Sequence, residues 1–64
     1  MRVLSAEKVK KLPVGTDVYL VNDTTGEKGR FWVFRCGIHK MLKGVLTNEP
    51  IRIRDLDGMH FEVE

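Results

Sequence analysis

The chain has 64 residues, of which 42% are hydrophobic and 31% are charged, and its 11 lysines and arginines against 9 acids give a net charge of +2. This length allows one small domain, residues 1–64, and the composition is typical of a globular protein rather than a disordered chain. The single cysteine excludes an internal disulfide, and no apolar run approaches the roughly 20 residues that span a bilayer. With no apolar signal segment at the N-terminus, these features predict a cytoplasmic protein without a membrane partner.

The N-terminal segment is expected to contain a short strand and then a helix of about two turns. Residues 1–4 favour a strand, and Ser5 is a suitable N-cap because its hydroxyl can accept from amides of the first helical turn. Ala6, Val9 and Leu12 form one apolar stripe, and the proline that follows them ends the segment. So short a helix is unstable alone, so we expect it to dock on the rest of the domain.

Two strands are predicted in the middle of the chain, over residues 16–22 and 30–36. Both segments are rich in β-branched and aromatic residues, which favour strands. The stretch between them, residues 22–29, consists mostly of turn-forming and polar residues and is expected to be a loop.

The second of these strands contains the run F-W-V-F, residues 31–34. Neighbouring side chains of a strand point to opposite faces, so the run places large apolar groups on both faces of a sheet. Either Phe31 and Val33 or Trp32 and Phe34 must join the core. The other pair is then covered by the N-terminal helix or left as a contact surface for a partner, and the sequence leaves both alternatives open.

Residues 37–49 allow two interpretations. Ile38, Met41, Leu42 and Val45 have the spacing of one helical face. We therefore predict a helical turn over residues 38–43, followed by a short strand over residues 44–47.

The C-terminal segment predicts a β-hairpin. Ile51 and Ile53 alternate with arginines, and Phe61 and Val63 alternate with polar residues. A three-residue loop over residues 56–58 would oppose Ile53 with Phe61 and Ile51 with Val63. Both apolar sets would then lie on one face, with glycine at the left-handed position of the turn.

No catalytic motif is present, neither a phosphate-binding glycine loop nor a nucleophile elbow. Cys36 and His39 stand three apart, with His60 further on, which provides half of a metal site. A metal or thiol site is therefore a remote alternative to a small buried cysteine and two surface histidines. Turn and surface roles account for Asp55 and Asp57. We expect no enzyme activity, no cofactor and no small-molecule substrate.

The function that the residues favour is binding. Trp, Tyr and Arg are the residue types that most often anchor interfaces. We expect a non-enzymatic module that contacts a protein partner or its own copy. The predicted contact surface consists of aromatic and basic residues: Trp32, Phe34, Tyr19, Arg30, Arg35, Arg52 and Arg54.

The alternative function is binding of single-stranded nucleic acid or RNA. From Lys28 to Lys43 the chain has five lysines and arginines and no acid. Basic groups beside aromatic rings suit phosphates and stacked bases, so Lys28, Lys40 and Lys43 would join the arginines in this role. The net charge is too small to favour nucleic acid by itself.

Together the elements predict a mainly β domain with one short N-terminal helix. A small curled antiparallel sheet, or partly open barrel, of four to five strands would bury the apolar set. L-P-V-G-T-D-V-Y-L, residues 12–20, resembles the entry to the first long strand of SH3-like barrels, and R-D-L-D-G-M-H-F-E-V, residues 54–63, resembles a hairpin near their end. The resemblance implies that architecture and no functional residue. A short chain that begins at Met1 is expected to be an accessory or regulatory protein of microbial or viral origin.

Overall fold

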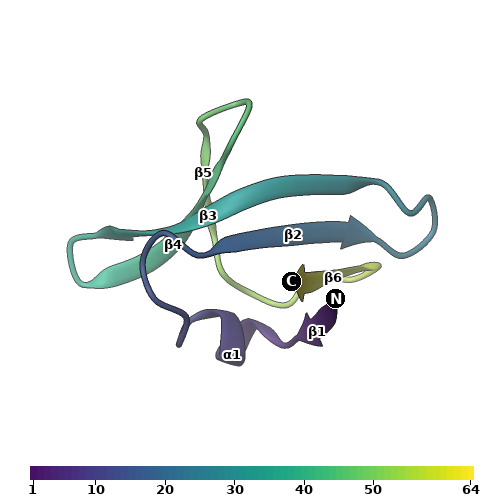
Figure 1. The fold of residues 1–64 in the computed structure, drawn as a ribbon, viewed down its shortest axis with the longest axis horizontal. Coiled ribbons are helices and arrows are strands. Elements are labelled where there is room, and N and C mark those ends of the chain that lie inside the picture. The colour runs from purple at the N-terminus through teal and green to yellow at the C-terminus, as the bar shows by residue number, and fades with distance from the viewer.

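The computed structural model describes residues 1–64 as one antiparallel sheet of six strands and one short helix (Figure 1). The strands follow the spatial order β1-β6-β2-β3-β4-β5, so β1 and β5 are the edges and the sheet is not closed into a barrel. The predicted class, a mainly β antiparallel domain with one short helix, is confirmed, but the strands number six instead of four to five. In chain order the elements are β1 (Arg2–Leu4), α1 (Ala6–Val9), β2 (Asp17–Asn22), β3 (Lys28–Cys36), β4 (His39–Gly44), β5 (Pro50–Arg52) and β6 (Met59–Val63).

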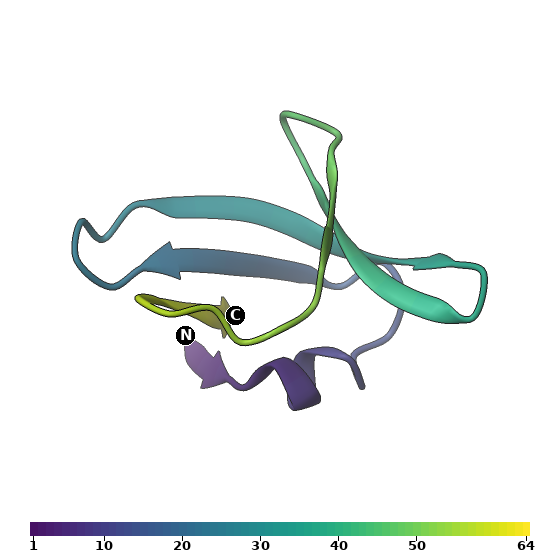
Figure 2. The same ribbon diagram turned by 180° about the vertical axis from the view of Figure 1, so that it is seen from behind.

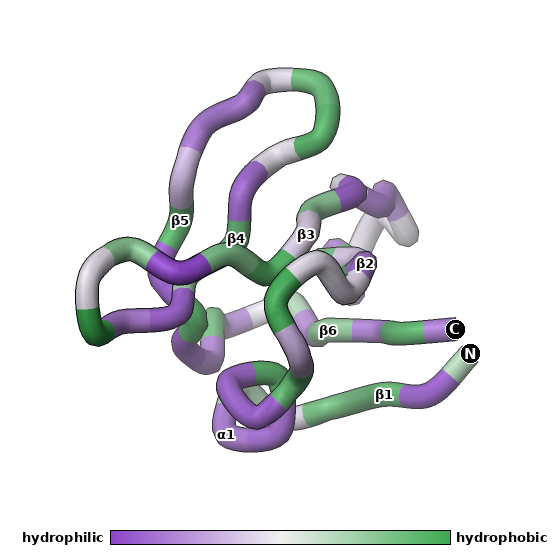
Figure 3. The backbone as a smooth tube through the Cα atoms, turned by 60° about the vertical axis from the view of Figure 1, so that its left-hand side comes forward, coloured by the Kyte–Doolittle hydropathy of each residue, from purple (hydrophilic) through white to green (hydrophobic).

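The sheet is strongly bent. In Figures 1 and 2, β5 and the loop before it rise away from β2 and β3, while α1 lies beside β1 and β6. Figure 3 shows β1 and β6 side by side with the two chain ends adjacent, and an apolar tip on the β4–β5 loop. Leu46 in that loop is 97% exposed.

Helix α1 is shorter than predicted, with four residues in helical geometry and a turn after them. Ser5 is its N-cap as predicted, and its Oγ accepts from the amide of Lys8 at 3.4 Å. A distant residue also caps this end, because the amide of Ala6 donates to Asp55 Oδ1 at 3.2 Å. The bond joins α1 to the segment between β5 and β6.

One face of the sheet, which we call the inner face, carries the core. Val18 and Leu20 of β2 share it with Val33 of β3 because side chains alternate along each strand. Helix α1 packs on this face through Ala6 and Val9. The nine buried residues of the core are Ala6, Val9, Val18, Leu20, Val33, Leu42, Ile53, Phe61 and Val63.

The helical turn predicted over residues 38–43 is wrong, because these residues form most of strand β4. A two-residue turn joins β3 to β4, with Cys36 opposite His39 and Gly37 at a φ of 63°. Glycine accepts that left-handed geometry without strain, so it favours a tight hairpin over a helix. The predicted strand over residues 44–47 is also wrong, since the chain turns after Gly44. Of the apolar set with helical spacing, only Leu42 is buried.

The C-terminal hairpin is wrong as well. Strand β5 pairs with β4, placing Ile51 opposite Leu42, whereas β6 inserts between β1 and β2, placing Phe61 opposite Leu20. The expected turn does form, with Gly58 at a φ of 74°, but it joins a crossover segment to β6. The alternation of apolar and polar residues determines which face of each strand is buried. It does not determine which strand lies next to it, because any neighbour with a matching apolar face can complete the burial.

Candidate interface on the outer face of the sheet

The opposite face of the sheet, the outer face, carries a continuous row of aromatic and basic side chains. Because Phe31 and Val33 point to the core, Trp32 and Phe34 point outward. Directly opposed residues of an antiparallel pair share a face, and the register therefore places partners from β2, β4 and β5 beside them. We call this set the outer-face cluster: Tyr19, Arg30, Trp32, Phe34, Met41, Lys43 and Arg52.

The two rings at its centre contact each other under a shared cation. The centroids of Trp32 and Phe34 are 5.8 Å apart, with their planes tilted by 55°. The ammonium of Lys43 lies 6.0 Å from the Trp32 centroid and 5.3 Å from the Phe34 centroid, which is cation–π geometry. Both aromatic side chains are half-buried.

Helix α1 does not cover this pair. Its buried residues, Ala6 and Val9, belong to the same core as Val33 and therefore lie on the inner face. Of the two alternatives that the sequence left open, burial under the helix is thus contradicted. Trp32 and Phe34 are shielded only by neighbouring side chains of the sheet, and no second layer of structure packs over them.

Charge is distributed unevenly over this face. Arg30 Nη2 donates to Asp17 Oδ2 at 2.7 Å, and this hydrogen bond, with the carboxylate charge, raises the pKa of Arg30 further above its ordinary value. Lys28 pairs with Glu62 at 3.3 Å. Lys43 and Arg52, on β4 and β5, form no ion pair. The β4–β5 side of the face is therefore uncompensated and positive.

The acidic side of the face is organised around His60. Its Nε2 lies 2.6 Å from Glu62 Oε2, and its Nδ1 faces the carboxylate of Asp23. The hydrogen bond to Glu62, followed by that to Asp23, raises the pKa of His60. The same bond, and the nearby ammonium of Lys28, lower the pKa of Glu62. When both of its ring nitrogens are protonated, His60 donates to both carboxylates and ties β6 to the β2–β3 loop.

Five of the seven predicted contact residues share the outer face: Tyr19, Arg30, Trp32, Phe34 and Arg52. The other two lie elsewhere. Arg35 is exposed near the tip of the β3–β4 hairpin, opposite Lys40. Arg54 follows β5 and lines a depression with Leu20 and Phe31 of the inner face.

The lysines of the nucleic-acid alternative are also divided between the two faces. Lys43 belongs to the outer-face cluster, and Lys28 lies further along the same face. Lys40 points the other way, where its Nζ donates to the carbonyl of Leu12 at 2.6 Å. Met41, opposite Phe34, was missed by the sequence interpretation because it was assigned to a helical turn.

The residues of the remote metal or thiol alternative do not gather. Cys36 is exposed, so its interpretation as a buried side chain is wrong, and it lies opposite His39 at the end of the hairpin. His60 is engaged on β6 with its two carboxylates. No group of three or more His, Cys, Asp or Glu side chains has an arrangement that would hold a metal ion.

Comparison with protein-family models, curated proteins and solved structures gave no significant match. The structure has no helix with the length and apolar character needed to cross a membrane.

Proposed function

We propose that this chain is a non-enzymatic binding module that docks an acidic protein partner against the outer-face cluster. The observation that carries the proposal is the Trp32–Phe34 pair, which has a shared cation above it and no second layer over it. Aromatic and arginine side chains at the centre of a patch are the usual anchors of protein interfaces. A partner would complete the burial that the sheet alone leaves unfinished.

Charge complementarity indicates what the partner carries. Lys43 and Arg52 lie on one side of the rings without carboxylate partners, whereas Arg30 on the other side is neutralised by Asp17. Acidic side chains on a partner would meet Lys43 and Arg52 without competing with an internal ion pair. Such pairing guides orientation and association rate more than it adds affinity.

The test compares capture from cell lysate, after nuclease treatment, by the wild type and two variants of the cluster. Trp32→Ala removes an anchor, and Lys43→Glu reverses the charge while keeping both rings. We expect both to weaken retention of the captured protein by about thirtyfold, the effect of losing an interface hot spot. Lys8→Glu is the matched control, because it makes the same charge change at an exposed helix position outside the cluster.

Circular dichroism of each variant must match the wild type, so that loss of binding is not loss of fold. Equal retention by wild type and Lys43→Glu would refute the proposal. Sedimentation of the wild type tests self-association. A dimer that Trp32→Ala abolishes would show that a second copy of the chain binds the outer-face cluster, and it would overturn the proposal of an acidic protein partner.

Single-stranded nucleic acid is the second candidate, favoured by rings that lie next to uncompensated cations. Trp32 is the only tryptophan of the chain, so its fluorescence reports on this face directly. Titration with oligo-dT and oligo-U at low salt would quench that fluorescence if bases stack on the ring. The logarithm of the binding constant would then fall linearly with the logarithm of the salt concentration. An unchanged signal at low salt would eliminate this candidate.

A further inference from the structure

The inner face of the sheet contains an apolar hollow of about 570 Å³ that no residue of α1 lines. Its walls come from β2, β3, β5 and the segment that leads to β6. We call it the Phe31 hollow, and its lining residues are Leu20, Phe31, Ile51, Arg52, Arg54 and Leu56. Phe31, Ile51 and Leu56 are only half-buried, so the chain alone does not complete the burial of this part of the inner face.

The β4–β5 loop carries a protruding apolar tip, Val45 and Leu46, beside this hollow. Both residues are exposed, and Figure 3 shows the apolar end of the loop. Gly44 faces the inner side of the sheet because it lies directly opposite Phe31. A Cβ at Gly44 would meet Thr47 Oγ1, so the loop bends over the inner face just after β4. Phe31, Val45 and Leu46 also line one common depression, which makes the tip and the hollow neighbours.

The charges beside the tip and beside the hollow are complementary. Glu49 lies on the same loop as the tip, and Arg54 lines the hollow. Both side chains are exposed, and neither forms an ion pair within the chain. A tip that entered the hollow of a second copy would bring Glu49 of one copy toward Arg54 of the other.

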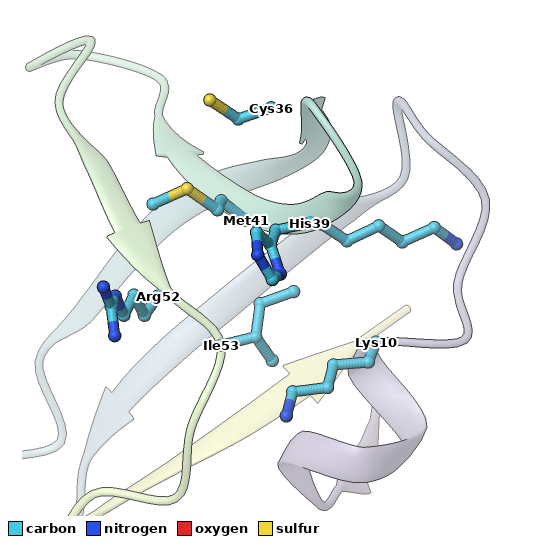
Figure 4. A pocket seen from close by; sticks show the side chains of 7 residues that line it. Lys10, Cys36, His39, Met41, Arg52 and Ile53 are labelled. Carbon is cyan, nitrogen blue, oxygen red and sulfur yellow. The ribbon is translucent and has the colours of Figure 1, made fainter.

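The depression next to α1 is less suited to an apolar tip. Figure 4 shows Lys10 and His39 along it, beside Ile53, which belongs to the core. Removing water from those polar groups against a leucine would cost free energy, whereas the Phe31 hollow offers half-buried apolar side chains. The Phe31 hollow is therefore the site that suits Leu46.

We propose that two copies of this chain form a twofold-symmetric dimer, in which the apolar tip of each copy inserts into the Phe31 hollow of the other. A twofold interface uses the same surface patch on both subunits, so it requires each contact element and its complement to lie side by side. The tip and the hollow meet this requirement, as do Glu49 and Arg54. The proposal does not depend on the proposed function, because the outer-face cluster lies on the opposite face and shares only Arg52 with the hollow.

The dimer is expected to be weak. Each contact consists of one loop tip in one hollow, which places the interface at the low end of the known size range, and we expect a Kd of about 0.1–1 mM. At low micromolar concentration the chain is then monomeric, with Leu46 exposed to solvent.

The experiment measures self-association of the full chain from well below to well above that Kd. Sedimentation equilibrium should show a monomer that converts to a dimer and to nothing larger. Amide NMR shifts should change with concentration at Leu46 and around Phe31. In a mixture of isotope-labelled and unlabelled chain, contacts between the Leu46 methyl groups of one copy and the Phe31 ring of the other should appear.

Two matched variants separate this contact from general stickiness. Leu46→Asp should weaken the dimer at least tenfold, because both hollows lose a leucine and meet a carboxylate instead. Ile38→Asp makes the same kind of change at a residue that is 92% exposed on the β3–β4 turn, outside the hollow, and should alter the Kd less than about twofold. The dispersion of each NMR spectrum shows whether the variant is folded.

A charge exchange tests the orientation of the two copies. Glu49→Arg and Arg54→Glu should each weaken the dimer by about threefold, and the double variant should recover most of the wild-type affinity. Recovery is expected only if the two side chains meet across the interface.

A chain that stays monomeric at several times the expected Kd would overturn the proposal, since something other than a second copy would then cover the hollow. Equal weakening by Leu46→Asp and Ile38→Asp, or growth beyond a dimer, would overturn it as well. Trp32→Ala should dimerise like the wild type. Failure of the outer-face proposal and failure of this one are therefore separate results.

Discussion

Replacing Leu42 with alanine is expected to reduce the free energy of unfolding by about 3 kcal/mol, within the roughly 2–5 kcal/mol measured for buried Leu→Ala changes. Leu42 is 0% exposed, lies opposite Val33 and Ile51, and occupies the middle of the core face. A domain of this size has a total stability of roughly 3–10 kcal/mol, so the loss is a third or more of it. The melting temperature should fall by on the order of 10–25 °C.

Leu46→Ala is the matched control, because the same atoms are deleted four residues later from a side chain that is 97% exposed. Its effect should stay within about 0.5 kcal/mol. Urea unfolding, followed by Trp32 fluorescence and far-UV circular dichroism, measures both variants, and equal m-values would show that the comparison is of stability alone.

The pair also discriminates between strand and helix. In a continuous helix, residues four apart lie on the same face, so Leu42 and Leu46 would be buried or exposed together. Losses within 1 kcal/mol of each other would therefore refute the strand register of β4 and the turn that follows it.

Two further predictions concern polar contacts. Asp55→Ala should reduce stability by about 1 kcal/mol, because the amide of Ala6 loses its side-chain acceptor, whereas Asp57→Ala should have little effect in the same urea assay. Equal effects would show that this bond to α1 is unimportant. The hydrogen bond to Glu62 raises the pKa of His60 in the folded protein. This bond therefore stabilises the fold fully below the ordinary histidine pKa of about 6.5, and the stabilisation is lost as pH rises through the higher pKa of the folded state. NMR titration should show a lower pKa for His60 in Glu62→Gln than in the wild type, and the stability of this variant should fall less as pH rises above neutral. An unchanged His60 titration would contradict the role of the Glu62 hydrogen bond.

Some elements of the structure follow from local sequence chemistry. Ser5 caps α1, and the β-branched and aromatic segments form β2 and β3, because N-capping and strand preference depend on a few neighbouring residues. The alternation of Ile51 and Phe61 with polar residues also predicted correctly that both strands turn these residues toward the core.

Other features depend on contacts between distant parts of the chain. Helical spacing at Ile38, Met41 and Leu42 was misleading because a two-residue turn at Gly37 brings β4 back along β3. Strands β5 and β6 follow each other in sequence but pair with different neighbours. The apolar face of a strand must be buried, but several different neighbouring strands or helices could bury it.

The amino-acid sequence alone determined that β3 would be apolar on both faces, since bulky side chains occupy consecutive positions from Phe31 to Phe34. Only the tertiary structure decided which pair points outward. Val33 opposes Leu42 and packs in the same core as Val9 of α1, so Trp32 and Phe34 are left on the uncovered face beside Lys43. The physical reason is that alternation relates the faces of one strand to each other, whereas the choice of the buried face depends on what the rest of the chain packs against it.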